Sequence, residues 1–370
     1  MCLEIGQELC CDRASTNNIR KNFKECRYHV TMNILITGGA GYIGSVMARM
    51  FLEEGYKVIV LDRLFFGKES LKEIENDPNL QIVKNDIRWF DPNILRGVDA
   101  VIDLAALSND PAGELDPQKT LEINYKGRVR VARLAKKYGV AKYVFASTCS
   151  VYGFQDKIVD ETSALNPLTT YAKSAVLAEK EIMPLGDKDF CVTFLRQATV
   201  YGLSPRMRFD LVINTMVLYL WKEGKLRIMR DGTQWRPFVH VKDTSRAFMK
   251  VIEVDEDIVN KQIFNVGSND QNYQIFPLAE MLAKALNMEL KYEWYGDPDK
   301  RSYKVDFSKI KNILKFKPKY TPEDAAKEIY NALEEGLVKD DIKTRTVQWY
   351  KYLLEAQKII KEVELNGRIL

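Results

Sequence analysis

The chain has 370 residues, of which 46% are hydrophobic and 29% are charged, which is ordinary for a globular protein. This length suffices for one large α/β domain with a smaller appended lobe, or for two domains. The net charge of +4 is spread thinly, and no dense block of Lys and Arg with interleaved aromatics argues for a nucleic-acid partner. No apolar run approaches the ~20 residues that a membrane span needs, so we expect no membrane partner.

The cysteines indicate neither a metal site nor a disulfide framework. Four of the six lie in the first 26 residues, and Cys149 and Cys191 sit in apolar, strand-like segments. None shows C-x-x-C spacing with matching His, so we predict no metal site, reduced core thiols and a cytoplasmic location. Residues 1–31 are polar, aperiodic and without the apolar core of a signal peptide, so we expect an extension before a domain that begins at Met32.

The first organised stretch runs from Asn33 to Ser45. An apolar run is followed by three glycines, Gly38, Gly41 and Gly44, and then by apolar residues at helical spacing. Strand, glycine turn and helix in this order are typical of a dinucleotide-binding loop. The glycines permit a tight turn, a close approach of backbone to a pyrophosphate, and close packing of helix on strand. The helix N-terminus then presents free N–H groups to the anion.

A second predicted strand, residues 57–62, ends in an acid. Asp62 lies 18 residues beyond Gly44, where a carboxylate can accept both ribose hydroxyls of NAD and repel the 2′-phosphate of NADP. The sequence therefore predicts NAD, although the adjacent Arg63 could soften that selectivity.

Further strand ends continue the pattern. A strand over 80–84 leads to Asp86 and Ile87, which we expect at the adenine, and one over 100–104 leads to Ala105 and Ala106, which would let backbone lie under the cofactor. A helix is predicted over 116–138 and a fifth strand over 143–146. Alternating strands and helices predict an α/β fold, a doubly wound parallel sheet of the Rossmann type, with ligands at the carboxyl ends of the strands.

The second half of the chain is less regular and rich in proline. We expect the Rossmann domain over 32–195 and a smaller C-terminal substrate-binding lobe over 196–370, with some segments returning to the sheet. Two amphipathic helices are predicted over 323–363, with Ile329, Leu333, Leu353 and Ile359 inside.

Tyr171 is the candidate acid/base group. Pro167 and Thr169 or Thr170 indicate a helix start, which places Tyr171 in the first turn, where the helix dipole favours phenolate. Thr148, after the fifth strand, can donate a hydrogen bond to the same substrate oxygen.

These motifs resemble those of the extended short-chain dehydrogenase/reductase family, specifically its nucleotide-sugar epimerases and dehydratases. The matching stretches are residues 37–44, 147–153, the Tyr171 segment and 236–243, within a resemblance that runs from Met32 to about residue 330. The resemblance implies NAD-dependent oxidation of a sugar carbon, usually C4, with Tyr171 and Thr148 as catalytic residues. It places Arg236 and Arg301 on the substrate diphosphate, which suits bidentate arginine chemistry.

The resemblance also implies two fuller sets of site residues. The cofactor-binding set is Gly38, Gly41, Tyr42, Ile43, Gly44, Asp62, Asp86, Ile87, Ala105, Ala106, Asn124 and Tyr171. The substrate-binding set is Ser108, Thr148, Arg208, Arg236 and Arg301.

The chain departs from the family motif Tyr-x-x-x-Lys at position 175. That lysine, one helical turn after the tyrosine, lowers the tyrosine pKa and binds the nicotinamide ribose, but here the residue is Ala175. Lys173 points to another side of the helix and cannot substitute. Either the natural enzyme uses a different base or a lysine was deliberately replaced, and both accounts stay open here. In either case we expect weak turnover, which Ala175→Lys should raise, because an unassisted tyrosine has a pKa near ~10.

A second departure concerns dehydration. The family's 4,6-dehydratases carry Asp-Glu after the threonine, whereas this chain has Cys149 and Ser150, so elimination lacks its acid/base pair. We therefore expect NAD-dependent oxidation or epimerisation at C4 of a nucleotide-diphosphate sugar. The alternatives are a 4-keto reductase or a 4,6-dehydratase and, from another class, a non-catalytic NAD-binding regulator, which Ala175 favours and the arginines oppose. The resemblance also implies a homodimer, formed through the 116–138 helix and the helix that begins near Tyr171.

Overall fold

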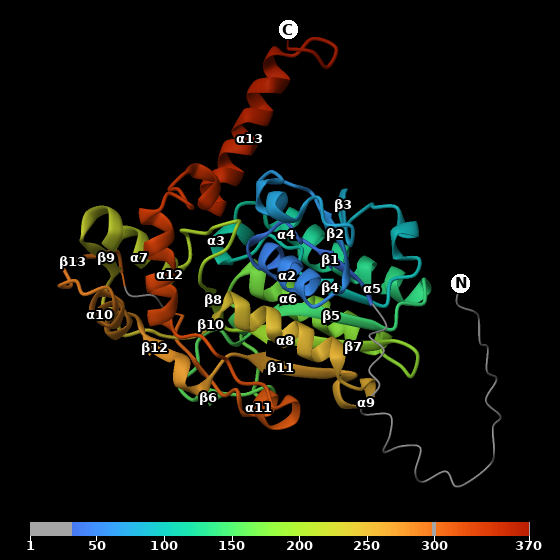
Figure 1. Cartoon of the computed structure of the whole chain (residues 1–370), viewed down its shortest axis with the longest axis horizontal. Helices are drawn as coiled ribbons and strands as arrows, with labels where there is room; N and C mark the ends of the chain where they lie inside the picture. The colour runs from blue at the N-terminus through green and yellow to red at the C-terminus, as the bar shows by residue number, and fades with distance from the viewer. Residues whose placement is uncertain (1–31, 298–300, 370) are drawn as a thin grey trace, which may run out of the picture. The chain divides into compact units, whose positions relative to one another are not determined.

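The computed structural model describes residues 32–297 and 301–369, and Met32–Leu370 forms one compact unit. The prediction of an N-terminal extension over 1–31 lies outside the described residues. Figure 1 shows the arrangement of the elements.

A parallel sheet of seven strands organises this unit. Its order is β11-β7-β5-β4-β1-β2-β3, and every neighbouring pair is parallel. The strands are β1 (Asn33–Thr37), β2 (Lys57–Asp62), β3 (Leu80–Lys84), β4 (Ala100–Asp103), β5 (Lys142–Thr148), β7 (Cys191–Gln197) and β11 (Gln262–Val266). The order runs outward in both directions from β1, so the expected doubly wound Rossmann sheet is confirmed.

Alternate residues of each strand enter two different cores. On β1, Ile34 and Ile36 pack with Met47 and Phe248, whereas Leu35 packs with Val131 on the opposite face. A strand that is buried on both faces reads as a continuous apolar run, as Ile34 to Ile36 does. Helices therefore cover both faces.

The helices that flank the sheet are α2 (Tyr42–Glu53), α4 (Pro117–Leu121), α5 (Arg128–Lys137), α6 (Thr170–Ile182) and α8 (Val241–Glu253). The predicted helix over 116–138 corresponds to α4 and α5 joined by a π-helical segment, Glu122–Gly127. Short π segments occur frequently at functional sites. The shorter α3 (Asp110–Gly113), α9 (Glu256–Val259) and α11 (Ser308–Leu314) connect other parts.

A separate hydrophobic core holds the smaller elements of the second half together. It contains Ile213, Leu278 and Ile329 from α7 (Val212–Glu223), α10 (Ile275–Ala285) and α12 (Pro322–Glu334). Small sheets complete this part: β8 (Thr199–Tyr201), β10 (Trp235–His240) and β12 (Asn272–Gln274); β9 (Leu226–Met229) with β13 (Tyr292–Tyr295); and β6 (Ile158–Val159) with β14 (Lys304–Val305). Since β11 belongs to the main sheet, the chain does return to it after residue 196, while the two-part division near 195 stays a prediction.

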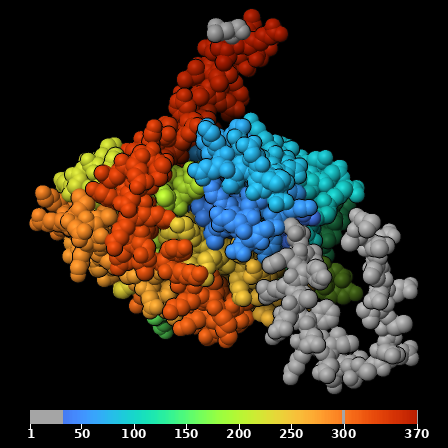
Figure 2. Space-filling model, in the orientation of Figure 1, coloured from blue at the N-terminus to red at the C-terminus, as the bar shows by residue number. Residues whose placement is uncertain are grey.

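The last helix, α13 (Thr346–Val363), differs from its prediction. Ile329 and Leu333 on α12 are buried as expected, but Ile359 is 52% exposed and Leu353 is only partly covered. The expectation that these two residues lie inside is wrong, because the outer part of α13 stands away from the surface (Figure 2). No helix within the described residues is long and apolar enough to span a membrane.

Candidate active site

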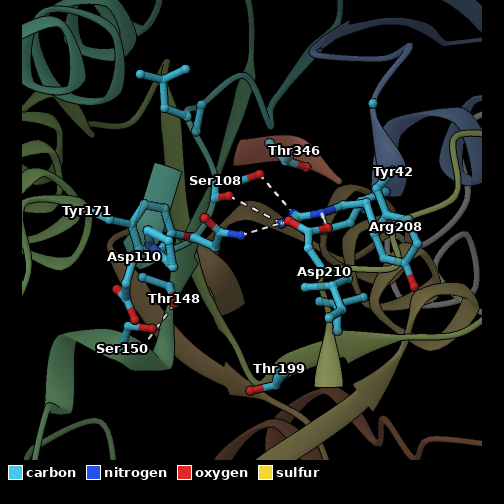
Figure 3. Close-up of a pocket in the computed structure, with 18 of the residues that line it drawn as sticks. Tyr42, Ser108, Asp110, Thr148, Ser150, Tyr171, Thr199, Arg208, Asp210 and Thr346 are labelled. Carbon is cyan, nitrogen blue, oxygen red and sulfur yellow. Dashed lines mark hydrogen bonds and ion pairs between the residues drawn. The ribbon is translucent and has the colours of Figure 1, made fainter. Parts of the chain in front are cut away.

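A cavity of about 590 Å³ opens at the carboxyl ends of the main-sheet strands. Its wall contains the glycine loop, the ends of β2, β4 and β5, the start of α6 and segments of the second half. Figure 3 shows Tyr171, Asp110, Thr148 and Ser150 together on one side, with Arg208 and Asp210 opposite them. Ligands of open α/β sheets bind at this edge.

The glycine loop fits a pyrophosphate. Gly38 has a φ of +72°, and a Cβ there would lie 3.0 Å from the Ala105 backbone, so side chains are excluded from this turn. A Cβ on Gly44 would lie 2.3 Å from the Gly38 carbonyl oxygen. Helix α2 begins at Tyr42 without a side-chain cap, so its first N–H groups remain available to an anion.

Asp62 lies at the end of β2, as predicted, and is oriented by the backbone. Its two carboxylate oxygens accept hydrogen bonds from the N–H of Ala40 (3.0 Å) and of Leu64 (2.7 Å). Burial raises its pKa above the ordinary range, and those N–H donors oppose the rise. The carboxylate borders the cavity at the position predicted for the ribose.

Asp86 also borders the cavity, but its carboxylate is engaged by arginines. Arg88 donates to both of its oxygens, at 3.0 and 2.9 Å, and Arg63 lies 3.7 Å away. Although burial raises the pKa of Asp86, the Arg88 hydrogen bonds lower it overall. Arg63 is therefore held beside Asp86 and over the Trp89 ring. The predicted contacts of Asp86 and Ile87 with adenine stay predictions.

The start of α13 closes the cavity near Asp62, which the sequence did not predict. Tyr350 packs against Phe65 and Phe66 at ring separations of 5.9 and 5.4 Å, and Trp349 Nε1 donates to the Phe65 carbonyl at 2.7 Å. Arg206 lies over the Phe66 ring, and burial lowers its pKa to about 10. The adjacent aromatics Phe65 and Phe66, which follow Asp62 after two residues in a loop, were a usable signal, because neighbouring aromatics in a loop indicate a contact.

Tyr171 and Thr148 meet at the other end of the cavity. Tyr171 is the second residue of α6, whose N-cap is Thr169, as predicted. Thr148 ends β5, and hydrogen bonding between the two side chains lowers the Tyr171 pKa. Burial nevertheless raises the Tyr171 pKa overall, and the expected contribution of the helix dipole stays a prediction.

Asp110 adds an unpredicted carboxylate beside Tyr171. It accepts a hydrogen bond from Thr169 Oγ1 at 2.7 Å and forms an ion pair with Arg301. Its charge contributes to the raised pKa of Tyr171. The only sequence signal was its place in the turn Asn109-Asp110-Pro111, which alone does not identify a functional carboxylate.

Arg208, from the second half of the chain, lies across the cavity from Tyr171 (Figure 3). It makes a bidentate pair with Asp210, at 2.9 and 2.8 Å, and donates to Ser108 Oγ at 3.0 Å. Burial alone would lower the Arg208 pKa, but Asp210 raises it, so the group stays charged. Asn109 Nδ2 donates to Asp210 at 3.1 Å and joins this network to the loop after β4.

Arg236 and Arg301 lie side by side on the cavity wall. Arg236 lies on β10, is 9% exposed and donates to the carbonyl oxygens of Trp235 and Arg301. The predicted diphosphate ligands are thus brought together from positions 65 residues apart.

Asn124 is the predicted site residue that does not reach the cavity. The others border it: Gly38, Gly41, Tyr42, Ile43, Gly44, Asp62, Asp86, Ile87, Ala105, Ala106, Ser108, Thr148, Tyr171, Arg208, Arg236 and Arg301. Asn124 is 2% exposed, accepts from the Leu107 N–H at 2.8 Å and donates to the Leu107 carbonyl at 3.1 Å. Both halves of its amide therefore hold the loop after β4, and its predicted contact with the cofactor stays a prediction.

The remaining candidates behave as structural residues. Cys149 and Cys191 are buried free thiols, and burial raises the Cys149 pKa. His240 is fully buried, stacks on Tyr320 and has its Nε2 3.2 Å from Glu328 Oε2, so it is a packed histidine. Within the described residues, no cluster of His, Cys, Asp and Glu could hold a metal ion.

The fold and this cavity define a dinucleotide-binding enzyme of the Rossmann class. The model of the NAD dependent epimerase/dehydratase family matches residues 34–267. The chain therefore belongs to that family, and NAD is its cofactor, as Asp62 and the glycine loop predicted.

Three similar proteins illustrate the range of reactions. A UDP-glucuronate 4-epimerase of Thermodesulfobacterium geofontis (strain OPF15) is 29% identical over 343 residues, covering 88% of this chain and 98% of that protein. UDP-glucuronic acid decarboxylase 6 of Arabidopsis thaliana is 28% identical over 307 residues, covering 79% and 86%. The crystal structure of DesIV, a dTDP-glucose 4,6-dehydratase from Streptomyces venezuelae with NAD and TYD bound, has a TM-score of 0.73 at 27% identity, covering 83% of this chain and 99% of that one.

Proposed function

We propose that this protein uses NAD to oxidise and then re-reduce C4 of a nucleotide-diphosphate sugar, and so interconverts two epimers. The observation that carries the proposal is the pairing of Tyr171 and Thr148 in the same cavity as the glycine loop and Arg236 and Arg301. Similar proteins named for UDP- and dTDP-linked sugars support this substrate class.

In this mechanism the chain positions the sugar and moves one proton. Arg236 and Arg301 bind the diphosphate, and Arg208 with Ser108 borders the sugar. Tyr171 Oη takes the proton of the C4 hydroxyl, and the Thr148 hydroxyl holds the same oxygen by a hydrogen bond. Bound NAD supplies the reversible acceptor for the C4 hydride. After the 4-keto sugar has rotated to present its opposite face, return of the hydride to C4 and of the proton from Tyr171 to the C4 oxygen would complete epimerisation.

Water loss fits this cavity less well. Cys149 is 1% exposed with a raised pKa, and Ser150 carries no carboxylate. Asp110, the carboxylate whose charge acts on Tyr171, is already engaged by Thr169 and Arg301. A 4,6-dehydratase therefore lacks a free carboxylate acid/base pair, whereas epimerisation at C4 needs no acid/base group besides Tyr171.

The test is a panel of UDP-, dTDP- and GDP-linked hexoses and hexuronates, incubated with protein and NAD and followed by proton NMR in D₂O. We expect one pair of C4 epimers to interconvert without incorporation of solvent deuterium at C4. Tyr171→Phe should abolish this interconversion while NAD still binds. Ala175 favours one alternative, a non-catalytic NAD-binding regulator. Calorimetry that detects NAD but no nucleotide or nucleotide sugar would support that alternative and refute the proposal.

We also propose a homodimer and a cytoplasmic location. Helices α5 and α6 pack side by side, and α6 leaves Leu177 39% exposed, which suits a helical interface. The buried free thiols of Cys149 and Cys191 suit a reducing compartment.

A further inference from the structure

A buried arginine begins helix α5 directly behind the reaction end of the cavity. Arg128 is 3% exposed and shares its helix face with Val131, Ala132 and Ala135, which are all buried. A charge on an otherwise apolar helix face is costly unless it is paired and hydrogen-bonded. Its position therefore calls for a structural or functional explanation.

The guanidinium is fixed between the ends of β4 and β5. Nη2 donates to the carbonyl oxygens of Asp103 and Ala146, the latter at 2.9 Å, and Cζ lies 3.7 Å from the centre of the Phe145 ring. Nε lies 3.3 Å from Asp103 Oδ2. Nη1 has no hydrogen-bond acceptor within the described part of the chain, and Arg128 borders the cavity. Nε is also without a hydrogen bond, but it is buried beside Asp103, so Nη1 is the donor group that is left for a ligand.

The counter-charge lies on the side away from the cavity. Asp103 is fully buried and accepts hydrogen bonds from Thr37 Oγ1 at 2.5 Å and from the Tyr143 hydroxyl. Arg128 borders the cavity, and Asp103 does not. The pair is therefore oriented with its positive member toward the ligand and its negative member toward the core.

Arg128 is also close to the catalytic tyrosine. Its acceptor Ala146 lies two residues before Thr148 on β5, and its charge lowers the Tyr171 pKa. The other charges that face Tyr171 are Asp110, which raises that pKa, and Arg208, which lowers it but is neutralised by its bidentate pair with Asp210. At position 175, one turn after Tyr171, there is only a buried methyl group.

We propose that Arg128 supplies, from helix α5, the positive charge that the Tyr-x-x-x-Lys motif supplies from position 175. In this role Arg128 stabilises the Tyr171 phenolate and offers Nη1 to the nearby sugar hydroxyls of NAD. The inference rests on the proposed function for the role of Tyr171. It also favours Ala175 as a natural residue, because the cation is already provided.

The test compares Arg128→Met with variants that isolate its charge. Arg128→Met combined with Asp103→Asn removes both charges, so no unpaired carboxylate is left buried, and Arg128→Met combined with Ala175→Lys restores a cation on α6. Arg128→Lys is the conservative variant. Arg133→Met, on the same helix at a side chain that is 63% exposed, is the matched control.

Two measurements need no sugar substrate. The Tyr171 titration is followed by NMR of ¹³Cζ-labelled tyrosine, with the signal identified by its loss in Tyr171→Phe, and NAD affinity is measured by calorimetry. We expect roughly tenfold less phenolate at a fixed alkaline pH and ~10-fold weaker NAD binding in Arg128→Met and in the charge-free double variant. Arg128→Lys and Arg128→Met/Ala175→Lys should recover most of both, and Arg133→Met should match the unaltered protein.

Unchanged Tyr171 titration and NAD affinity in the charge-free double variant would overturn the proposal. A large increase in turnover rate from Ala175→Lys alone would also overturn it. Such an increase is expected if Tyr171 has no neighbouring cation, but not if Arg128 already supplies one. If no nucleotide sugar is turned over by any variant while both measurements shift, the proposed function fails and the role of Arg128 stands. Should Arg128→Met fail to fold, the neutral double variant and Arg128→Lys decide the outcome.

Discussion

Adding a methyl group at Gly44 should weaken NAD binding while the protein still folds. An added Cβ would lie 2.3 Å from the Gly38 carbonyl oxygen and 2.6 Å from Gly39 Cα, whereas ordinary contacts begin at 3.4 Å. The loop and α2 must therefore part by about 1.1 Å, the difference between 3.4 and 2.3 Å. Such overpacking costs ~1–3 kcal/mol. Because the displaced backbone carries the N–H groups that face the pyrophosphate, we expect NAD binding to weaken roughly 5- to 150-fold in Gly44→Ala.

Calorimetric titration with NAD measures this effect, and thermal unfolding without NAD monitors the fold. Gly41→Ala, whose Cβ would lie 3.0 Å from the same carbonyl oxygen, should give a smaller loss. Gly55→Ala is the control, because its Cβ meets open space and its left-handed φ affects only stability. The reasoning is refuted if Gly44→Ala binds NAD within threefold of the unaltered protein, or if Gly55→Ala weakens binding equally.

Three further changes test other parts of the molecule. Burial alone would raise the Glu328 pKa, but hydrogen bonds from His240 and Lys242 lower it from 4.5 to about 2. The stability that this carboxylate contributes at neutral pH is therefore lost as pH falls from 4.5 toward 2. Glu328→Gln should lower the free energy of unfolding, measured by urea titration, by ~2 kcal/mol at pH 7. It should also make the free energy of unfolding fall less steeply between pH 4.5 and 2. Tyr350→Ala should weaken NAD binding ~10-fold in calorimetry by uncovering the cavity near Asp62, while Ile359→Ala, at a 52% exposed position on the same helix, should not. Leu177→Glu should convert the proposed dimer to monomer in light scattering, and an unchanged mass would exclude this interface.

The sheet could be predicted because its determinants are local. The ends predicted for β2 and β3 coincide with those of the structure, since each strand is a short apolar run bounded by polar turn residues. The glycine loop and Asp62 were equally predictable, because the chain geometry at a βα turn depends on residues next to each other. Ile359 shows the opposite case: its periodic pattern correctly indicated a helix but could not say whether anything covers it.

The parts of the site that were missed depend on contacts between distant segments. Tyr350 reaches the cavity because α13 docks on the loop that contains Phe65. The hydrogen bond from Trp349 to the Phe65 carbonyl joins residues that are 284 positions apart in the chain. Asp110 acquires a role only through Thr169 and Arg301. Arg128 could be recognised in the sequence as a charged residue on the apolar face of a predicted helix. Its partners on β4 and β5 could not be predicted, because they contact it only in the folded structure.

Tyr42 gives the glycine loop a connection to the second half of the chain. Its hydroxyl donates to the Gly202 carbonyl at 2.6 Å and accepts from Asn214 at 3.0 Å, while its residue borders the cavity. A cofactor that restrains this residue therefore restrains the segments that carry Arg208 and, through them, the sugar end of the cavity. Thermodynamic linkage then requires reciprocity: whatever factor NAD adds to the affinity for the nucleotide sugar, the nucleotide sugar adds to the affinity for NAD.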